Sequence, residues 1–438
     1  MKITVVALGK IGLPLAVQFA SKGHHVFGAD VNPAVVDQVN RGVEPFPGED
    51  QLAEKLAEVV SAGSLQATVD TTWAVSQSEA VVVVVPLFVD GAGRPDFGWM
   101  DDATRAIGAG LKPGTLVSYE TTLPVGTTRD RFGPMLAERS GLEPGAGFSL
   151  VFSPERVFTG RVFADLRRYP KLVGGIDEAS GRRGAAFYEA VLDFDERPDL
   201  SRANGVWDLG STEAAELAKL AETTYRDVNI GLANQFAMFA EKRGIDAQAV
   251  IEASNSQPFS HIHRPGIAVG GHCIPVYPRF YLWNDPDATV VRAAREANAA
   301  MPAYAVDRLA DLYGDLAGAR VVVLGASYRG GVKETAFSGV FATVAALAAK
   351  EAVAVVHDPM YEDHELESLG LAPYRLGEPV DAAILQADHA EYRSLSAADL
   401  PGVKALLDGR GTTDPSRWEG VSRHVLGSAP ALQPSTRR

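Results

Sequence analysis

The chain has 438 residues, of which 46% are hydrophobic and 22% charged, a composition typical of a globular protein with two or three domains. Its 41 Lys and Arg residues against 55 Asp and Glu residues give a formal net charge of −14, which argues against binding to nucleic acid or to an anionic membrane. The single cysteine, Cys273, excludes an internal disulfide framework and a cysteine-based zinc site, so we expect no metal.

The first thirty residues follow the pattern of a dinucleotide-binding unit. An apolar run at 3–8 predicts a buried strand, and a second strand at His25–Ala29 ends at Asp30, 18 residues after Gly12. The turn and helix between them would bring backbone N–H groups to a pyrophosphate, while Asp30 would accept ribose hydroxyls and repel the extra phosphate of NADP. Ala7 replaces the first glycine of the usual pattern. We therefore predict NAD as the cofactor, the alternative being a tight turn in another α/β fold.

Helix and strand patterns alternate from there to residue 152, which predicts an open parallel sheet. We expect helices near 50–61, 100–110 and 127–140, and strands at Ala80–Val85, Thr115–Glu120 and Phe148–Phe152. Ligands of such sheets bind outside the carboxyl ends of the strands, where Thr122 and Glu155 lie. Glu155 is alternatively an ordinary surface acid, because its spacing alone assigns no role.

A proline-free run of helix formers from Ser211 to Arg243 predicts one helix more than about 45 Å long. Such a helix commonly links two domains or forms a dimer interface. One of its faces carries, at helical spacing, Lys219, Glu222, Thr223 and Arg226. This face is either a solvated stripe with a Glu222–Arg226 pair or the support of a lysine directed at a reaction site. A second helix is expected at Thr289–Tyr313.

The cysteine lies in the segment RPGIAVGGHCIPVYPRF, residues 264–280, between Gly270–Gly271 and two prolines. Glycines let a backbone approach a ligand closely, and prolines stiffen the loop that follows. A thiol on such a turn suits a nucleophile, the alternative being a small buried hydrophobic residue. A thiol beside a nicotinamide suits oxidation of an aldehyde through a thiohemiacetal and a thioester, with Lys219 stabilising the oxyanion and Glu155 activating the water.

The chain shows no signal peptide and no run of 18 apolar residues. We therefore expect a cytoplasmic protein without a membrane association, whose reducing surroundings keep Cys273 free.

A second α/β pattern begins with the strand Arg320–Leu324. It continues with a helix near 337–349 and strands at Ala352–His357, Val380–Leu385 and Val403–Leu407. The predicted fold class is accordingly α/β, with two Rossmann-like doubly wound domains joined by a long central helix and a helical middle domain.

Seven motifs carry a close resemblance to a known family. In chain order they are ALGKIGLPLA, GADVN, TTLPVGTT, SPERVFTGR, ELAKLAETTYRDVNI, PGIAVGGHCIPVYP and VVVLGASYRGGVKET. The chain resembles the UDP-glucose/GDP-mannose dehydrogenase family over roughly residues 1–425. SPERV and GGHCIP are more similar to the branch that acts on UDP-N-acetylhexosamines than to the branch that acts on UDP-glucose.

The resemblance implies NAD-dependent oxidation of the C6 primary alcohol of a UDP-sugar to the uronate, with two NAD⁺ per turn, by a homodimer formed through the central helix. It also implies a place in polysaccharide biosynthesis. By resemblance Cys273 is the nucleophile, Lys219 stabilises the oxyanion, Glu155 is the acid/base, and Thr122 lies near the nicotinamide and the hydrolytic water. The resemblance implies cofactor contacts from Gly9, Lys10, Ile11, Gly12, Asp30, Val85 and Thr122. It implies substrate contacts from Glu155, Arg156, Val157, Lys219, Arg264, Gly270, Tyr328 and Arg329.

Several positions depart from the family pattern. Thr223 stands where the family usually has a catalytic Asn, Tyr277 where it has Asp, and Ala336 where it has Arg, while Arg329 is more often Lys. Tyr277 is no carboxylate near pH 7, since the unperturbed pKa of tyrosine is about 10. The missing charge must then come from elsewhere, with Glu155 and Glu222 as candidates.

The resemblance also assigns the domains. We expect an NAD-binding domain at 1–205, a helical dimerisation domain with Lys219 and Cys273 at 206–305, a UDP-sugar-binding domain at 306–427, and a disordered tail at 428–438. Two alternatives to four-electron oxidation stay open: a two-electron enzyme that stops at the 6-aldehyde, and a catalytically weak nucleotide-sugar-binding protein.

Overall fold

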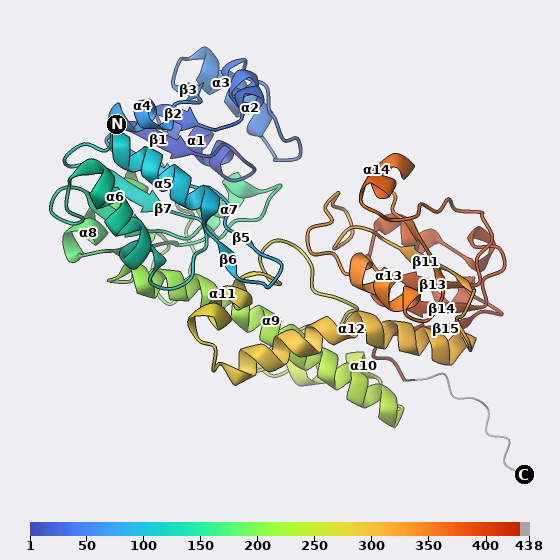
Figure 1. Cartoon of the computed structure of the whole chain (residues 1–438). Coiled ribbons are helices and arrows are strands. Elements are labelled where there is room, and N and C mark those ends of the chain that lie inside the picture. Colours follow the sequence, from blue (N-terminus) through green and yellow to red (C-terminus); the bar gives the residue numbers. More distant parts are fainter. Residues whose placement is uncertain (430–438) are drawn as a thin grey trace, which may run out of the picture. The chain divides into compact units, whose positions relative to one another are not determined.

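In the computed structural model, which describes residues 1–429, the chain divides into a first unit, Met1–Glu222, and a second unit that begins at Thr223 (Figure 1). The division falls inside the long helix α9, Thr212–Arg243, so this helix contributes to both units. The disordered tail predicted at 428–438 lies, from residue 430 on, outside the described residues.

The first unit is built on an eight-stranded sheet in the order β10-β9-β8-β7-β4-β1-β2-β3. Its strands are β1 (Lys2–Val6), β2 (His25–Ala29), β3 (Leu65–Thr68), β4 (Ala80–Val83), β7 (Leu116–Tyr119), β8 (Ser149–Phe152), β9 (Lys171–Gly175) and β10 (Val206–Asp208). Two further strands of two residues each, β5 (Phe88–Val89) and β6 (Pro95–Asp96), form a separate antiparallel hairpin. The strand order reverses between β1 and β4, as in a doubly wound dinucleotide-binding fold.

Helices cover this sheet because their apolar faces complete its core. The helices are α1 (Gly12–Ser21), α2 (Pro33–Asn40), α3 (Leu52–Ser61), α4 (Thr71–Ser76), α5 (Gly98–Gly110), α6 (Gly133–Ser140), α7 (Val162–Arg168) and α8 (Glu178–Val191). Residues of α1, α2, α3, α7 and α8 share one hydrophobic core with the strands, and α4, α5 and α6 pack on one another. In folds of this kind the ligands bind outside the carboxyl ends of the strands.

The second unit combines helices with a five-stranded parallel sheet. Its helices are the C-terminal part of α9 together with α10 (Ala247–Asn255), α11 (Tyr277–Asn284), α12 (Thr289–Tyr313), α13 (Val340–Ala348) and α14 (Asp363–Ser368). The sheet has the order β12-β11-β13-β14-β15, made of β11 (Arg320–Leu324), β12 (Val353–His357), β13 (Ala382–Leu385), β14 (Ala405–Asp408) and β15 (Ser422–Val425). Short 3₁₀ turns occur at 390–394, 397–399 and 415–417.

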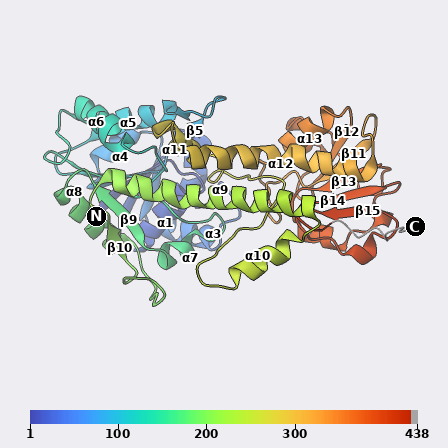
Figure 2. The same ribbon diagram turned by 90° about the horizontal axis from the view of Figure 1, so that it is seen from below.

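Alternation along β11 shows how this sheet is buried on both faces. Val321 and Val323 belong to the core shared with α12, α13 and α14, whereas Val322 and Leu324 belong to a second core on the other side. The C-terminal part of α9 lies beside α12 (Figure 2), where Asn234 donates to Asn298 at 2.9 Å. Both Rossmann-like parts thus have the doubly wound arrangement that the sequence predicts.

The structure corrects two expectations for the first unit. The sheet is mixed and not wholly parallel, because β9 pairs antiparallel with β8 through Val151 and Gly175. The helix expected near 127–140 is a π-helix at Thr127–Phe132 that continues as α6. Pro134 in the first turn of α6 has no backbone N–H to donate, which accompanies this change of hydrogen-bond pattern.

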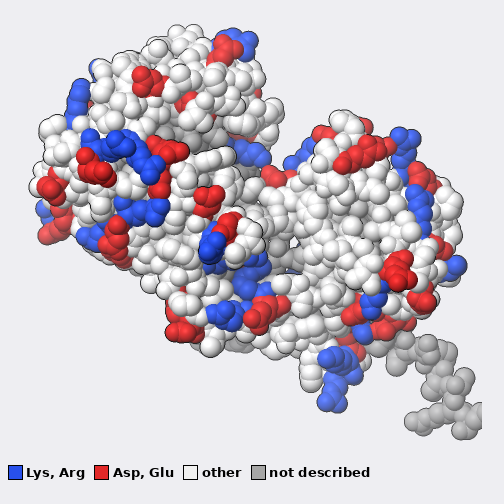
Figure 3. Space-filling model, viewed as in Figure 1, with Lys and Arg blue, Asp and Glu red and all other residues white. Residues whose placement is uncertain are grey.

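The surface carries charges of both signs. On the face seen in Figure 3, Lys and Arg side chains are interspersed with Asp and Glu side chains. The chain forms ion pairs between such residues, for example Arg41–Asp37 at 2.9 Å. Exposed pairs of this kind contribute little stability. Among the described residues, no helix combines the length and the apolar character needed to cross a membrane.

Candidate active site

The turn after β1 has the backbone geometry of a dinucleotide cradle. Ala7 adopts a left-handed φ of 75°, the conformation that the family's glycine would supply without strain. A Cβ on Gly12, the first residue of α1, would lie 1.9 Å from the Ala7 carbonyl oxygen, so only glycine fits there. A Cβ on Gly9 would meet nothing within 4 Å, which leaves open space above the turn for a phosphate.

The acid at the end of β2 holds this turn in place. Asp30 accepts the Leu8 N–H at 2.8 Å and the Asn32 N–H at 2.9 Å. Val85 follows the neighbouring strand β4, and its carbonyl accepts the Thr121 hydroxyl at 2.7 Å. The predicted cofactor residues before position 86 therefore gather at one edge of the first sheet, and they fit NAD.

A small cavity of about 60 Å³ adjoins the turn, lined by Gly9, Lys10, Leu13, Phe46, Pro47, Gly48, Glu49, Leu52 and Thr159. Glu49 closes one side of it, accepting the Gly160 N–H at 2.6 Å and the Val162 N–H at 2.5 Å. This carboxylate thereby fastens the loop that carries Glu155, Arg156 and Val157 near the cofactor turn.

Glu155 lies at the carboxyl end of β8 in a buried charge cluster. Lys171, the first residue of β9, donates to Glu155 at 2.8 Å and to Glu120 at 2.7 Å. The Tyr188 hydroxyl donates to the other oxygen of Glu120 at 2.6 Å. Lys171 and Glu120 are buried, and the Glu155 side chain is 11% exposed.

The cluster shifts the pKa values of its two carboxyl groups in opposite directions. Burial raises the pKa of Glu120 to about 7. Burial is the largest influence on Glu155 and would raise its pKa too, but the charge and hydrogen bond of Lys171, together with the hydrogen bond from the Arg156 N–H, outweigh burial and lower the pKa. Glu155 is thus no ordinary surface acid.

The N-terminal half of α9 is fastened to the loop that follows β7. Glu216 accepts the Gly126 N–H at 2.6 Å, and the N–H and hydroxyl of Thr128 at 2.9 and 2.7 Å. Thr122 lies at the start of this loop and is buried. Lys219 follows Glu216 by one helical turn and is also buried, as is Thr223 one turn later.

The polar face predicted on α9 is not a simple solvated stripe. Glu222 accepts from Arg156 at 2.9 Å, within the loop that also carries Glu155. Glu155 and Glu222 are therefore both engaged with cations of the first unit, and neither is an unengaged replacement for the carboxylate missing at Tyr277.

In the second unit, Cys273 is a free, exposed thiol, which contradicts the alternative of a buried hydrophobic residue. Its turn is packed against the loop after β11. A Cβ on Gly270 would lie 2.5 Å from the Tyr328 Cβ, and Gly271, at a φ of 92°, donates its N–H to the Ala336 carbonyl at 2.8 Å. The Cys273 carbonyl accepts the Tyr277 N–H at 2.9 Å, so the thiol immediately precedes α11.

Residues 261–266, which precede this turn, are bound to α9 by hydrogen bonds, while the side chain of Arg264 is exposed to solvent. Asn229 binds both sides of the segment, donating to the His261 carbonyl at 2.6 Å and accepting the His263 N–H at 2.9 Å. The Asn234 side chain accepts the Gly266 N–H at 2.9 Å. Arg264 is exposed between these anchors.

Tyr328 and Arg329 lie on the turn after β11, at the edge of the second sheet. The exposed Arg329 donates to the Tyr328 hydroxyl at 3.3 Å. Arg410, at the end of β14, donates to the Tyr328 carbonyl at 3.3 Å and to the Gln386 carbonyl at 2.8 Å. Burial lowers the pKa of Arg410, although two nearby carboxylates oppose this.

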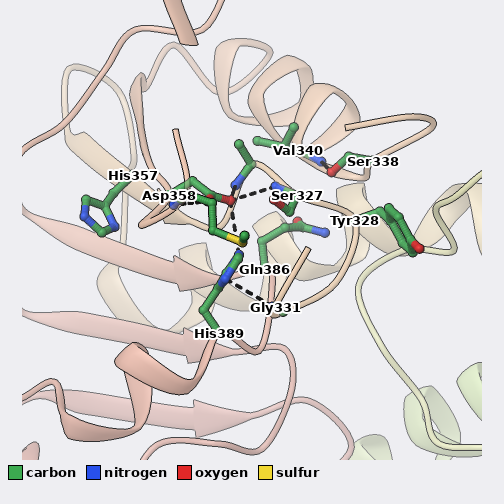
Figure 4. A network of polar contacts seen from close by, with 12 residues as sticks. Ser327, Tyr328, Gly331, Ser338, Val340, His357, Asp358, Gln386 and His389 are labelled. Atoms are coloured by element: carbon green, nitrogen blue, oxygen red, sulfur yellow. Dashed lines mark hydrogen bonds and ion pairs between the residues drawn. The ribbon is translucent and has the colours of Figure 1, made fainter. Parts of the chain in front are cut away.

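A buried acid–histidine pair holds the same turn (Figure 4). Asp358, at the end of β12, accepts the N–H groups of Ala326 and Ser327 at 2.9 Å and lies 3.1 Å from His389 Nε2. His389 Nδ1 accepts the Gly331 N–H at 3.4 Å. His389 therefore carries its proton on Nε2 and donates it to Asp358. The backbone on both sides of Tyr328 and Arg329 is fixed by this pair.

The structure thus groups the predicted residues by unit. The cofactor turn, Thr122, Glu155 and Lys219 belong to the first unit, and Arg264, Gly270, Cys273, Tyr328 and Arg329 belong to the second. Sequence reasoning missed Glu120, Lys171, Glu216, His389 and Arg410. Glu120 carried a usable signal, because it ends a predicted strand as Asp30 does, and so did Asp358, the acid that binds His389.

Comparisons with known proteins agree across the chain. Three family models match: "UDP-glucose/GDP-mannose dehydrogenase family, NAD binding domain" over residues 1–192, the family's "central domain" over 213–300, and its "UDP binding domain" over 322–415. A UDP-N-acetyl-D-mannosamine dehydrogenase of Pyrococcus horikoshii is 33% identical over 418 residues, covering 94% of this chain and 95% of the relative.

Solved structures give the same picture. The UDP-D-ManNAc dehydrogenase from Pyrococcus horikoshii matches with a TM-score of 0.86 and 30% identity, covering 98% of this chain and 100% of that one. An NDP-N-acetyl-D-galactosaminuronic acid dehydrogenase from Methanosarcina mazei matches with a TM-score of 0.83 and 28% identity, covering 98% and 95%.

Proposed function

Since the chain belongs to the UDP-glucose/GDP-mannose dehydrogenase family and is an NAD-dependent nucleotide-sugar dehydrogenase, we propose that it oxidises the C6 alcohol of a UDP-N-acetylhexosamine to the uronate. The overall change converts one alcohol, two NAD⁺ and one water into one carboxylate, two NADH and three protons. The named relatives act on N-acetylated sugars, which favours that substrate class over UDP-glucose.

The observation that carries the proposal is the exposed thiol of Cys273 on a turn that only glycines can build. An alcohol dehydrogenase that stops at the aldehyde needs no thiol. Attack of the thiolate on the C6 aldehyde forms a C–S bond and a thiohemiacetal, and its oxidation leaves a thioester that water cleaves to the acid.

Other side chains assist these steps. The Lys219 ammonium stabilises the oxyanion that develops at C6, with Thr223 as a hydrogen-bond donor of shorter reach than the family's Asn. Glu155 takes a proton from the hydrolytic water, a role for which its ion pair with Lys171 keeps it ionised. Thr122, at the end of β7, orients that water near the nicotinamide.

NAD, when bound, supplies the acceptor for the hydride lost in each of the two oxidations. The turn at Gly9, Lys10, Ile11 and Gly12 would hold its pyrophosphate and Asp30 its ribose, and Val85, after β4, would add a further contact. The open space above Gly9 and the fixed carboxylate of Asp30 support this assignment.

The nucleotide sugar is assigned to Tyr328, Arg329 and Gly270 of the second unit, to Arg156 and Val157 beside Glu155, and to Arg264. Arg264 and Arg329 are exposed cations, which suits contact with phosphate. The domain division at 1–205, 206–305 and 306–427 follows the same assignment of roles.

A homodimer forms through α9. What supports it is a row of exposed apolar side chains, the α9 stripe, made of Tyr225, Leu232, Phe236 and Phe239, which are 62%, 46%, 39% and 59% exposed. Their spacing places them on one face of the helix. Rows of this kind mark interaction surfaces.

The reaction takes place in the cytoplasm, where reducing conditions preserve the single free thiol. Its uronate product enters polysaccharide biosynthesis.

The test is to incubate the purified protein with NAD⁺ and a panel of nucleotide sugars, and to count NADH per uronate. Two NADH per uronate with a UDP-N-acetylhexosamine supports the proposal. One NADH with aldehyde as the product supports a two-electron enzyme, and binding of UDP-sugar and NAD⁺ without NADH supports a binding protein; either result overturns the proposal.

A further inference from the structure

Three charged groups meet in the first unit where the carboxyl ends of β7 and β8 lie beside the amino end of the antiparallel strand β9. They are Glu120, directly after β7, Glu155 in the loop after β8, and Lys171 at the start of β9. Lys171 bridges the two carboxylates at 2.7 and 2.8 Å.

Every carboxylate oxygen of the trio has a donor. Glu120 accepts from Tyr188 of α8 and from Lys171, while Glu155 accepts from Lys171 and from the Arg156 N–H at 2.7 Å. The neighbouring charged groups are Arg156 and, through it, Glu222 of α9. The Lys171 ammonium also lies 4.7 Å from the centre of the Tyr188 ring. The cluster is therefore fully satisfied without a ligand.

One cation between two carboxylates leaves a net charge of −1 in a buried place if both are ionised. A buried, uncompensated charge is costly, so the trio retains one proton, whose apparent pKa belongs to the cluster. Glu120 is the more buried carboxyl, at 0% exposure against 11% for Glu155, and burial raises its pKa to about 7. The proton therefore stays on Glu120.

The hydrogen bonds allow Glu120 to be neutral. Its Oε2 faces the lysine, so a proton on Oε1 would be donated to the Tyr188 hydroxyl. Tyr188 would then turn its own proton toward the Ser118 hydroxyl, 2.6 Å away, where either oxygen serves as donor. Ser118 is buried, so this chain stays separate from solvent.

We propose that Lys171 and Glu120 are positioning residues for the reaction: Lys171 holds the Glu155 carboxylate ionised and oriented, and Glu120 takes the proton that Glu155 would otherwise hold. The inference rests on the proposed role of Glu155 as the base for hydrolysis. It predicts that the protonation state of Glu155 is set by Lys171 and Glu120, which do not contact the substrate.

The sign of the effect follows from the contacts. Burial raises the pKa of Glu155, and Lys171 opposes this effect. Without Lys171 the pKa of Glu155 should therefore rise, so that Glu155 becomes protonated, and is lost as a base, at a higher pH than in the parent protein. Lys171→Met should therefore move the acid limb of the kcat/KM profile upward by about two pH units or more. Lys171→Arg keeps the cation and should restore most of the parental profile.

Glu120→Gln is the matched control. It copies the neutral form of Glu120 and leaves Lys171 to Glu155 alone, so the acid limb should stay where it is or move to lower pH. A merely structural role would lower kcat at every pH and leave the limb in place.

A second measurement is independent of turnover. Carbon-13 NMR of the ¹³C-carboxyl-labelled glutamates in the ligand-free protein titrates both groups directly, with Glu120→Gln and Glu155→Gln assigning the signals. We expect one signal that titrates near pH 7 and disappears in Glu120→Gln, and a Glu155 signal that titrates at higher pH in Lys171→Met.

The proposal is overturned if Glu155 titrates at the same pH in Lys171→Met as in the parent protein. If Lys171→Arg is the only Lys171 substitution that folds, the proposal is overturned when Glu120→Gln shifts the titration of the Glu155 signal to higher pH. A correct NMR result with no uronate produced would instead refute the proposed function and leave the trio intact.

Discussion

At the scale of the residue, backbone hydrogen bonds from two positions that depart from the family pattern hold the turn that carries Cys273. Ala336 has no guanidinium, yet its carbonyl accepts the Gly271 N–H at 2.8 Å and fixes the Cys273 turn. Tyr277 brings no charge, but its N–H donates to the Cys273 carbonyl. The two departures remove charged side chains, and the backbone groups at both positions still hold the Cys273 turn.

Cys273→Ser tests the nucleophile. We expect steady-state uronate formation to fall by roughly 10³-fold or more, because a serine hydroxyl without an adjacent base is a far weaker nucleophile than a thiolate. Calorimetric binding of UDP should be unchanged, since Gly270 and Gly271 still build the turn. Release of uronate at near the parental rate would refute the covalent mechanism.

At the scale of the element, α9 has two faces with different tasks. One face is tied to the first unit by Glu216, whose three accepted hydrogen bonds fix the turn that precedes Lys219. The other carries the α9 stripe to the surface. The helix therefore holds the buried Lys219, to which we assign the oxyanion, and offers an apolar surface at the same time.

Leu232→Glu tests that surface. A charge placed in the centre of an apolar interface must be desolvated on association, so the dimer dissociation constant should rise by roughly 10²-fold or more. Light scattering at micromolar concentration should report a dimer for the parent protein and a monomer for the variant. Val69→Glu, at an equally exposed position outside α9, should stay dimeric; a monomeric parent protein would rule out the proposed dimer.

At the scale of the whole molecule, the two units have separate cores, and the turns proposed for NAD and for the UDP part of the substrate belong to different units. The cofactor turn belongs to the first unit and the turn with Tyr328 to the second. Ligand binding should therefore stabilise each unit by itself, as linkage requires.

Calorimetry tests this division. We expect two unfolding transitions, with NAD⁺ raising the midpoint of one and UDP that of the other by roughly 5–10 °C at a hundredfold excess over Kd. Asp30→Ala removes the acceptor at the end of β2 and should abolish the shift with NAD⁺ while keeping the shift with UDP. If both ligands moved the same transition, the assignment of one ligand to each unit would be wrong.

The sequence by itself determined the elements and motifs whose signals are local. The turn at Gly9–Gly12, the strand-end acid Asp30, the glycines before Cys273 and the helix α9 are each specified by residues within a few turns of chain, because backbone sterics and helical periodicity act over that range. The family followed from the order of these motifs.

Only the tertiary structure decided the electrostatic partners. Lys171 reaches Glu120 across 51 residues of sequence, Glu216 reaches Gly126 across 90, and His389 reaches Asp358 across 31. No periodicity links such positions, since the packing of strands and helices brings them together and burial then sets their charge. The same physics explains why Glu155 was visible in the sequence as an acid at a strand end, while its partner Lys171 was not.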